Sequence, residues 1–152
     1  MNALIGKRIY REATIADIPV LHTIRMAVKE NVLRNPLYVT EKDYAPFITT
    51  KGKGWVCEEV KKILGFVILD IENKNIWALF VLPDQESKGV GKALMRILLK
   101  WHFLRSSSSL WLSTGPGTRA ERFYELTGWK KVGTLENGEV KFEIASVEYF
   151  GA

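Results

Sequence analysis

Three consecutive strand-like segments in the middle of the chain constrain its fold more than any other feature. Residues 55–60, 63–71 and 76–82 are rich in β-branched and aromatic side chains, which favour β-strands. They are joined by Lys61-Lys62 and by Glu72-Asn73-Lys74-Asn75, and connections this short leave room only for hairpins. The sequence therefore predicts an antiparallel three-stranded meander.

Helix signals precede this meander. Asp17-Ile18-Pro19 resembles a helix start, because a proline in the first turn loses no hydrogen bond. Apolar residues then recur at helical spacing over residues 18–32, and Asn35-Pro36 ends the pattern. A second, short helix is expected over residues 40–48, followed by a glycine-containing turn at residues 51–54.

The second half of the chain alternates helix and strand signals. A capping box, Thr118 to Glu121, starts one helix, and Asn137-Gly138 predicts a hairpin turn. The expected elements are an amphipathic helix over 92–104, a strand over 110–113, a helix ending at Gly128, and strands over 130–134 and 140–144. With a first strand over 7–11, the order predicts an α+β fold in one domain, residues 1–152: a mixed, mostly antiparallel twisted sheet of about seven strands covered by about four helices.

Composition narrows the class of protein. With 152 residues, 47% of them hydrophobic, the chain suffices for one well-packed domain. Its longest apolar run, residues 76–82, is far shorter than the roughly 20 residues that span a bilayer, and the N-terminus turns charged too early for a secretory signal. We therefore expect a cytoplasmic protein without a membrane partner. The net charge of +5 indicates an anionic partner and does not distinguish a nucleotide-like ligand from nucleic acid.

One cysteine and two histidines are too few for a disulfide framework or a usual structural zinc site, so no metal is expected. Cys57 lies in a predicted strand, where a buried, inert thiol is typical. His22 and His102 fall on predicted helices, and we expect each to be hydrogen-bonded or to face solvent.

The segment between the third strand of the meander and the next helix has the sequence DQESKGVGKAL, residues 84–94. Glycines at a helix N-terminus let backbone N–H groups approach a phosphate, but the same composition makes an ordinary turn. A P-loop would need glycine at Glu86 and serine or threonine at Ala93, and a dinucleotide fingerprint would need glycine at Leu94. Both of these readings fail, and a generic loop and another kind of phosphate site remain open.

In its context this loop resembles the signature of the GNAT superfamily of N-acetyltransferases. Val81, Pro83, Gly89, Val90 and Gly91 match a strand that ends in an apolar-Val-x-Pro step and a Gly-x-Gly helix start. A second match lies downstream, at Arg119-Ala120, Phe123-Tyr124 and Gly128-Trp129. The resemblance runs from about residue 7 to residue 144 and implies the GNAT fold.

The resemblance implies acetyl-CoA as the acyl donor. Its pyrophosphate would lie on the N–H groups of residues 87–92, and its pantetheine arm would pair with residues 79–81, where an N–H would stabilise the oxyanion. Arg96 would approach the adenosine end. The implied cofactor-binding residues are Leu79, Phe80, Val81, Ser87, Lys88, Gly89, Val90, Gly91, Lys92, Ala93, Ser113, Gly117, Arg119 and Ala120.

Two positions depart from the family pattern. Glu86 stands where the family favours glutamine or arginine, and a carboxylate there repels a pyrophosphate. Gly117 stands where the family usually has asparagine, so Ser113 or Thr114 would have to supply the side-chain contact to pantetheine. We therefore expect the pyrophosphate to be bound mainly by backbone.

Tyr124 falls at the family's tyrosine position, which implies a general acid that protonates the leaving CoA thiolate. The alternative is a core aromatic residue beside Phe123. A general base is harder to assign, because Ile76 to Leu79 contains no glutamate. Candidates are Glu30, Asp70 or Glu58 through water, or no residue at all if the acceptor amine has a low pKa.

The expected acceptor is a primary amine of a small molecule or a peptide. The residues predicted to line the acceptor site are Arg25, Lys29, Glu30, Asn31, Tyr38 and Trp77. Arg119 and Arg122 would meet an anionic acceptor or the CoA phosphates. Two alternatives stay open: a catalytically degenerate protein that binds CoA as a sensor or interaction partner, and a basic nucleic-acid-binding domain. The second has no helix-turn-helix or zinc pattern to support it, so no nucleic acid is expected. A homodimer is compatible with the sequence.

Overall fold

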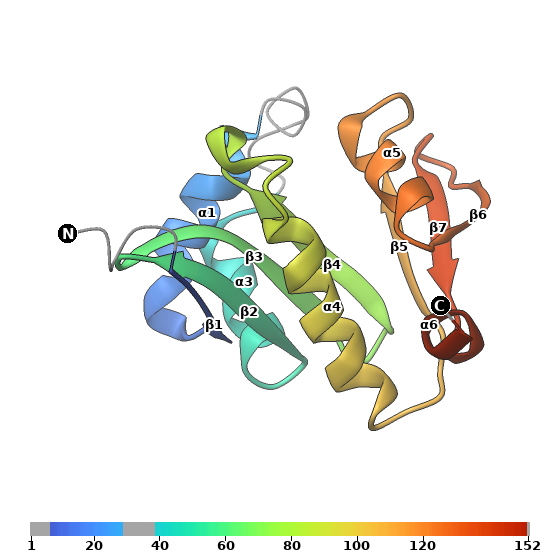
Figure 1. Ribbon diagram of the computed structural model, residues 1–152, viewed down its shortest axis with the longest axis horizontal. Coiled ribbons are helices and arrows are strands. Elements are labelled where there is room, and N and C mark those ends of the chain that lie inside the picture. Colours follow the sequence, from blue (N-terminus) through green and yellow to red (C-terminus); the bar gives the residue numbers. More distant parts are fainter. Residues whose placement is uncertain (1–6, 29–38, 152) are drawn as a thin grey trace.

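A computed structural model describes residues 7–28 and 39–151 of the chain. Seven strands form one sheet in the order β1-β2-β3-β4-β5-β7-β6 (Figure 1). The strands are β1 (Arg8–Glu12), β2 (Gly52–Glu59), β3 (Lys62–Asp70), β4 (Asn75–Val81), β5 (Leu110–Thr114), β6 (Lys130–Thr134) and β7 (Val140–Ile144). Every neighbouring pair is antiparallel except β4 and β5. The predicted meander and the predicted fold class are both confirmed.

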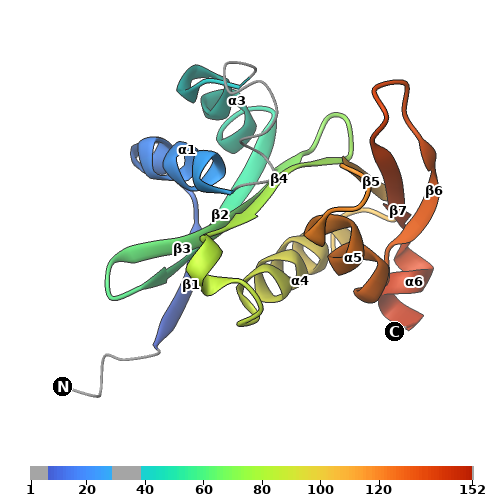
Figure 2. The ribbon, with the colours of Figure 1, turned by 90° about the horizontal axis from the view of Figure 1, so that it is seen from above.

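Helices cover both faces of this sheet. They are α1 (Ile18–Ala27), α3 (Tyr44–Ile48), α4 (Val90–Phe103), α5 (Arg119–Leu126) and α6 (Ser146–Gly151), with 3-10 turns η2 (Ile15–Asp17), η3 (Glu41–Asp43) and η4 (Pro83–Gln85). Figure 2 shows α1 and α3 on one face, and α4, α5 and α6 on the other. The short helix α6 was not expected from the sequence.

Strand β3 is the centre of two hydrophobic cores, one on each face. Val67 and Leu69 belong to the core under α4 and α5, whereas Phe66 and Ile68 belong to the core under α1 and α3. All four side chains are completely buried. This double burial explains why β3 is continuously apolar instead of alternating, since both faces of a central strand need apolar contacts.

Two sequence predictions about boundaries were wrong. Helix α1 ends at Ala27, and Val28 is already extended; the rest of the predicted range, residues 29–32, lies outside the described residues. Residues 51–54 were expected to form a turn, but Gly52 is the first residue of β2. A Cβ at Gly52 would overlap the carbonyl oxygens of Leu69 and Phe47, so glycine is needed there for close backbone approach within a strand.

The cysteine and the histidines have structural roles. Cys57 is completely buried, and burial raises the pKa of its thiol, as expected for an inert residue. His102 Nε2 donates to the carbonyl oxygen of Ser108 over 2.7 Å, and His22 Nδ1 lies 3.1 Å from the Tyr44 hydroxyl. Both histidines are therefore hydrogen-bonded.

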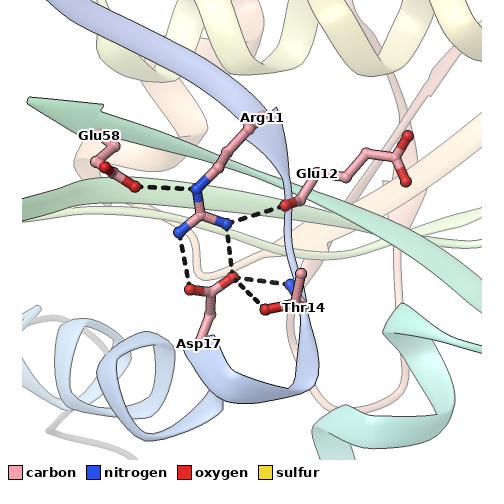
Figure 3. Close-up of polar contacts among 5 residues, drawn as sticks. All are labelled: Arg11, Glu12, Thr14, Asp17 and Glu58. Atoms are coloured by element: carbon pink, nitrogen blue, oxygen red, sulfur yellow. Dashed lines mark hydrogen bonds and ion pairs between the residues drawn. The ribbon is translucent and has the colours of Figure 1, made fainter. Parts of the chain in front are cut away.

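An arginine joins the first strand to the first helix and to the second strand (Figure 3). Arg11 donates from both terminal nitrogens to the two carboxylate oxygens of Asp17, each over 2.9 Å, and from Nε to Glu58, also over 2.9 Å. Asp17 also accepts from the Thr14 N–H over 2.8 Å. Hydrogen bonding from Arg11 holds the pKa of the Asp17 carboxyl below its ordinary value, despite the opposing effect of burial.

We predict that Asp17→Asn lowers the free energy of unfolding by about 1–3 kcal/mol at neutral pH, because it leaves partly buried donors of Arg11 and Thr14 poorly satisfied. The pKa of Asp17 is lowered on folding, so this contribution is complete above the unfolded value of 3.8 and is lost as the pH falls through the folded value. Urea unfolding should show the gap between wild type and variant closing below about pH 4. The control is Glu12→Gln, which removes an exposed pair with Lys53 and should cost little. If the Asp17→Asn variant loses the same free energy of unfolding at every pH, this account is contradicted.

Candidate functional site

The sheet is joined at its middle by one pair of residues. In the described structure, Asn75 and Trp111 are the single register pair between β4 and β5. Three hydrogen bonds hold this point: Trp111 N to Lys74 O (3.0 Å), Trp111 Nε1 to Asn73 O (3.0 Å) and Asn75 Nδ2 to Trp111 O (3.2 Å). Beyond it β4 and β5 diverge (Figure 1). The edge of β4 that faces β5 therefore has no strand partner from residue 76 to residue 81, among the residues described.

A bulge in β4 accompanies this divergence. Ile68 and Leu69 of β3 are neighbours, yet they pair with Ala78 and Ile76, so Trp77 is an extra residue in β4. A bulge bends its strand and increases the local twist. The bend is consistent with β4 turning away from β5.

A cavity of about 1400 Å³ lies where the two strands part. Its wall comes from β4, the segment 85–92, β5, α5, the end of α1 and the turn before β7. Because α1 lies on one face of the sheet and α4 and α5 lie on the other, the cavity reaches from one face to the other (Figure 2).

The loop before α4 brings backbone at the start of a helix to the cavity. Gly89 is the N-cap of α4 and has φ +87°, a left-handed conformation that favours glycine. Ser87, Gly89, Gly91 and Lys92 line the cavity. Three other predicted loop residues do not: the Lys88 carbonyl accepts from Arg8, Val90 is buried in the core, and Ala93 lies outside the wall.

Glu86 has a partner that the sequence did not reveal. Its carboxylate lies 3.4 Å from Nε of Arg119, the first residue of α5, and Arg119 Nη2 donates to Ser87 Oγ over 2.9 Å. Arg119 therefore reaches across the cavity to the loop. A cation from α5 faces the loop at the position where the loop itself carries an acid.

Tyr124 lines the cavity from α5 and is 6% exposed. Its ring centroid lies 5.3 Å from that of Phe123, 5.9 Å from Trp129 and 5.8 Å from Phe142. Burial raises its pKa above the ordinary value of 10.0. Tyr124 is thus at once a core aromatic residue and a cavity residue, and its phenol stays protonated at neutral pH.

The start of α5 is well ordered by its caps. Thr118 Oγ1 accepts from the Glu121 N–H over 3.2 Å, and Glu121 Oε1 accepts from the Gly117 N–H over 2.8 Å. The predicted capping box is therefore present in a variant form, in which the glutamate bonds one residue earlier. Thr118, Arg119 and Ala120 line the cavity, whereas Gly117 does not.

The predicted acceptor residues are only partly within the described structure. Arg25 and Trp77 line the cavity, and the Arg25 guanidinium carbon lies 5.2 Å from the Trp77 ring centre and 4.8 Å from the Phe80 ring centre. Of the other predictions, Lys29, Glu30, Asn31 and Tyr38 lie outside the described residues. Leu79, Phe80, Val81 and Ser113, which are predicted to bind the cofactor, line the cavity.

Two of the candidate bases, Asp70 and Glu58, are not part of the cavity wall. Asp70 accepts from the backbone and side-chain nitrogens of Asn73 in a turn, and Glu58 accepts from Arg11. Glu139, which sequence reasoning missed, does line the cavity, and Ser113 Oγ donates to it over 2.7 Å. Its position depends on the pairing of β5 with β7, and no local signal indicates that pairing.

The described residues contain no group of three or more histidine, cysteine, aspartate or glutamate side chains placed to hold a metal ion. Within the same part of the chain, no helix is both long and apolar enough to cross a membrane.

Comparison with known proteins identifies a family. The model of the acetyltransferase (GNAT) family matches residues 18–129. The chain is 29% identical over 100 residues to the peptidyl-lysine N-acetyltransferase YiaC of Escherichia coli (strain K12), a match that covers 60% of this chain and 65% of that relative. The chain thus spans slightly less than two thirds of that relative's length.

Solved structures agree on the fold. PaiA N-acetyltransferase from Thermoplasma acidophilum, in complex with coenzyme A, superposes with a TM-score of 0.74 at 14% identity, covering 91% of this chain and 99% of that chain. The ribosomal-protein-S18-alanine N-acetyltransferase from Escherichia coli has a TM-score of 0.72 at 19% identity, covering 90% of this chain and 91% of that chain.

Two glycines of the loop should respond differently to alanine. Gly89→Ala forces a left-handed conformation on an L-residue and should lower the free energy of unfolding by about 1–2 kcal/mol. Gly91→Ala is the matched control, because its Cβ would meet Val81 at 3.6 Å and Phe123 at 3.8 Å, both ordinary contacts. Chemical denaturation should show the control unchanged or slightly stabilised. Equal losses in the two variants would contradict the assigned backbone.

Proposed function

The chain belongs to the GNAT acetyltransferase family, and we propose that it transfers the acetyl group of acetyl-CoA to a primary amine of a small molecule or a peptide. The observation that supports this most directly is the continuity of the cavity. It connects the unpaired edge of β4 to the N-terminus of α4 on one face of the sheet, and to Arg25 of α1 on the other face.

The donor side of the cavity fits two parts of acetyl-CoA, its pantetheine arm and its pyrophosphate. An extended chain with amide groups can add to an unpaired strand edge by backbone hydrogen bonds, and the edge of β4 over residues 76–81 offers that position to pantetheine. The N-terminus of α4 carries partial positive charge and unsatisfied N–H groups, which suit a pyrophosphate. Lys92 and Arg119 line the same part of the cavity and add positive charge.

In this arrangement the thioester carbonyl would lie beside β4, near residues 79–81. A backbone N–H there would stabilise the negative charge that develops on the carbonyl oxygen. Tyr124 would protonate the sulfur of the leaving thiolate. Because burial raises its pKa, the phenol carries the required proton throughout the neutral range.

The acceptor would enter from the α1 side, beside Arg25 and Trp77. The relative named as a peptidyl-lysine N-acetyltransferase makes a lysine side chain the first acceptor to test. We also propose a cytoplasmic location, where acetyl-CoA is available, with neither a membrane nor a nucleic-acid partner.

The first experiment measures thiol release from acetyl-CoA with a panel of lysine peptides, α-amines and polyamines. Wild type should release thiol with at least one class, and Tyr124→Phe should lower kcat by about 100-fold while acetyl-CoA affinity stays nearly unchanged. Tyr149→Phe is the matched control, since Tyr149 stacks on Phe103 outside the cavity wall.

Two outcomes would revise this proposal. Unchanged turnover in Tyr124→Phe would remove Tyr124 from the role of general acid. Binding of acetyl-CoA without thiol release from any amine would favour a CoA-binding sensor, the alternative to which the unusual Glu86 and Gly117 point.

The pairing of Glu86 with Arg119 makes a separate prediction. Glu86→Gln removes a negative charge from the loop and leaves Arg119 available to the pyrophosphate, so acetyl-CoA should bind about two- to five-fold more tightly. Asp84→Asn, in the same loop but outside the cavity wall, is the control. Calorimetric titration at two salt concentrations should show the gain shrinking at high salt. Weaker binding by Glu86→Gln would mean that Glu86 itself supports the ligand.

A further inference from the structure

The wall of the cavity holds two carboxylates among the residues described, Glu86 and Glu139. Glu86 lies in the loop before α4, on the donor side, where it pairs with Arg119. Glu139 lies in the turn between β6 and β7. The two acids therefore belong to different parts of the cavity.

The alternation of β5 assigns Glu139 to the acceptor side. Leu110 and Leu112 belong to the core under α4 and α5, so Trp111 and Ser113 point to the opposite face of the sheet, the face on which α1 lies. Ser113 Oγ donates to Glu139 Oε1 over 2.7 Å. The carboxylate therefore lies on the face from which the acceptor would enter.

The backbone of Glu139 is held by a hydrogen-bonded turn. The Leu135 N–H donates to the Glu139 carbonyl over 2.8 Å, and the Glu139 N–H donates to Asn137 Oδ1 over 3.0 Å. The next residue, Val140, is buried and pairs with Thr114 of β5. Backbone and side chain are thus both anchored, and the half-buried carboxylate has a defined position beside the cavity.

The other ionisable groups on this face either have no acceptor capacity or lie outside the cavity wall. Arg25 carries a guanidinium, which has no acceptor capacity, and Lys141 and Glu143 of β7, 3.7 Å apart, are not part of the wall. His22 forms its hydrogen bond with Tyr44 and is not part of the wall. Glu139 is therefore the carboxylate on the acceptor face that can act as a base, within the described part of the cavity.

We propose that Glu139 is the general base of the reaction and that Ser113 is its positioning residue, an inference that rests on the proposed acetyl transfer. An alkylammonium has no lone pair and cannot attack a thioester. Glu139 takes one proton from it and passes that proton to solvent. The freed amine forms a C–N bond with the carbonyl carbon, the C–S bond breaks, and the sulfur leaves with a proton from Tyr124. The nitrogen gives up its second proton and Tyr124 is reprotonated, so each turnover yields one amide, one thiol and one released proton.

The test compares two acceptors that differ in protonation. Nα-acetyl-lysine amide is an ammonium at about pH 7, whereas methoxyamine is already a neutral amine there. Glu139→Gln should lower kcat/KM for the lysine amide by about 100-fold, and the loss should shrink as the pH rises, because solvent then supplies the free amine. For methoxyamine the same variant should change kcat/KM by less than about three-fold.

Three further variants complete the design. Ser113→Ala should give a smaller loss with the same preference for the lysine amide, and Glu139→Asp should restore part of the rate. Glu136→Gln, an exposed acid of the same hairpin outside the wall, is the control and should leave both acceptors unaffected. In the Glu139 and Glu136 variants the affinity for acetyl-CoA should match wild type, which verifies folding.

Equal losses for the two acceptors, or no loss in Glu139→Gln, would overturn the assignment of Glu139. If Glu139→Gln does not fold, Ser113→Ala takes its place in the test. A loss of kcat/KM for the lysine amide but not for methoxyamine would support the assignment, and equal losses would overturn it. Wild type that binds acetyl-CoA but acetylates neither amine would instead overturn the proposed function.

Discussion

The rest of the structure depends on how β4 meets β5. One register pair, Asn75 with Trp111, joins the two halves of the seven-stranded sheet, and the bulge at Trp77 directs β4 away from its neighbour immediately afterwards. An unpaired strand edge inside a sheet exposes polar backbone groups, which native proteins normally satisfy. Here that edge lines a cavity of about 1400 Å³, so a ligand with amide groups can satisfy it.

The sheet also separates the cavity into two sides. The core under α4 and α5 supports the glycine-containing loop before α4 and Tyr124, whereas the core under α1 and α3 supports Trp77 and Phe80 against Arg25. Both cores share β3, which is buried on each face. A central strand that is buried on both faces can therefore hold the groups on the two sides of the cavity in a constant relation, which the proposed direct transfer between two substrates would require.

Much of this arrangement could be predicted because its signals are local. Strand and helix periodicity, the capping box at Thr118 and the Asn137-Gly138 turn each depend on residues a few positions apart, and they indicated the correct elements in the correct order. Errors arose where a distant contact overrides a local preference. Residues 51–54 have the composition of a turn, but Gly52 pairs with Asp70 of β3, and glycine is needed there because Phe47 and Leu69 leave no room for a Cβ. Sequence reasoning also missed the partner of Glu86, because Arg119 lies far along the chain.

By itself, the sequence determined the order of the elements, the fold class and the position of the glycine loop at a helix start, since these follow from periodicity, turn chemistry and short motifs. Only the tertiary structure decided which side chains share the cavity. Ser113 and Glu139 lie on opposite sides of α5 in the sequence, and they meet because β7 pairs with β5 in one register. Such a pairing depends on how the whole face of each strand packs in the folded chain. No single segment of the sequence therefore determines it.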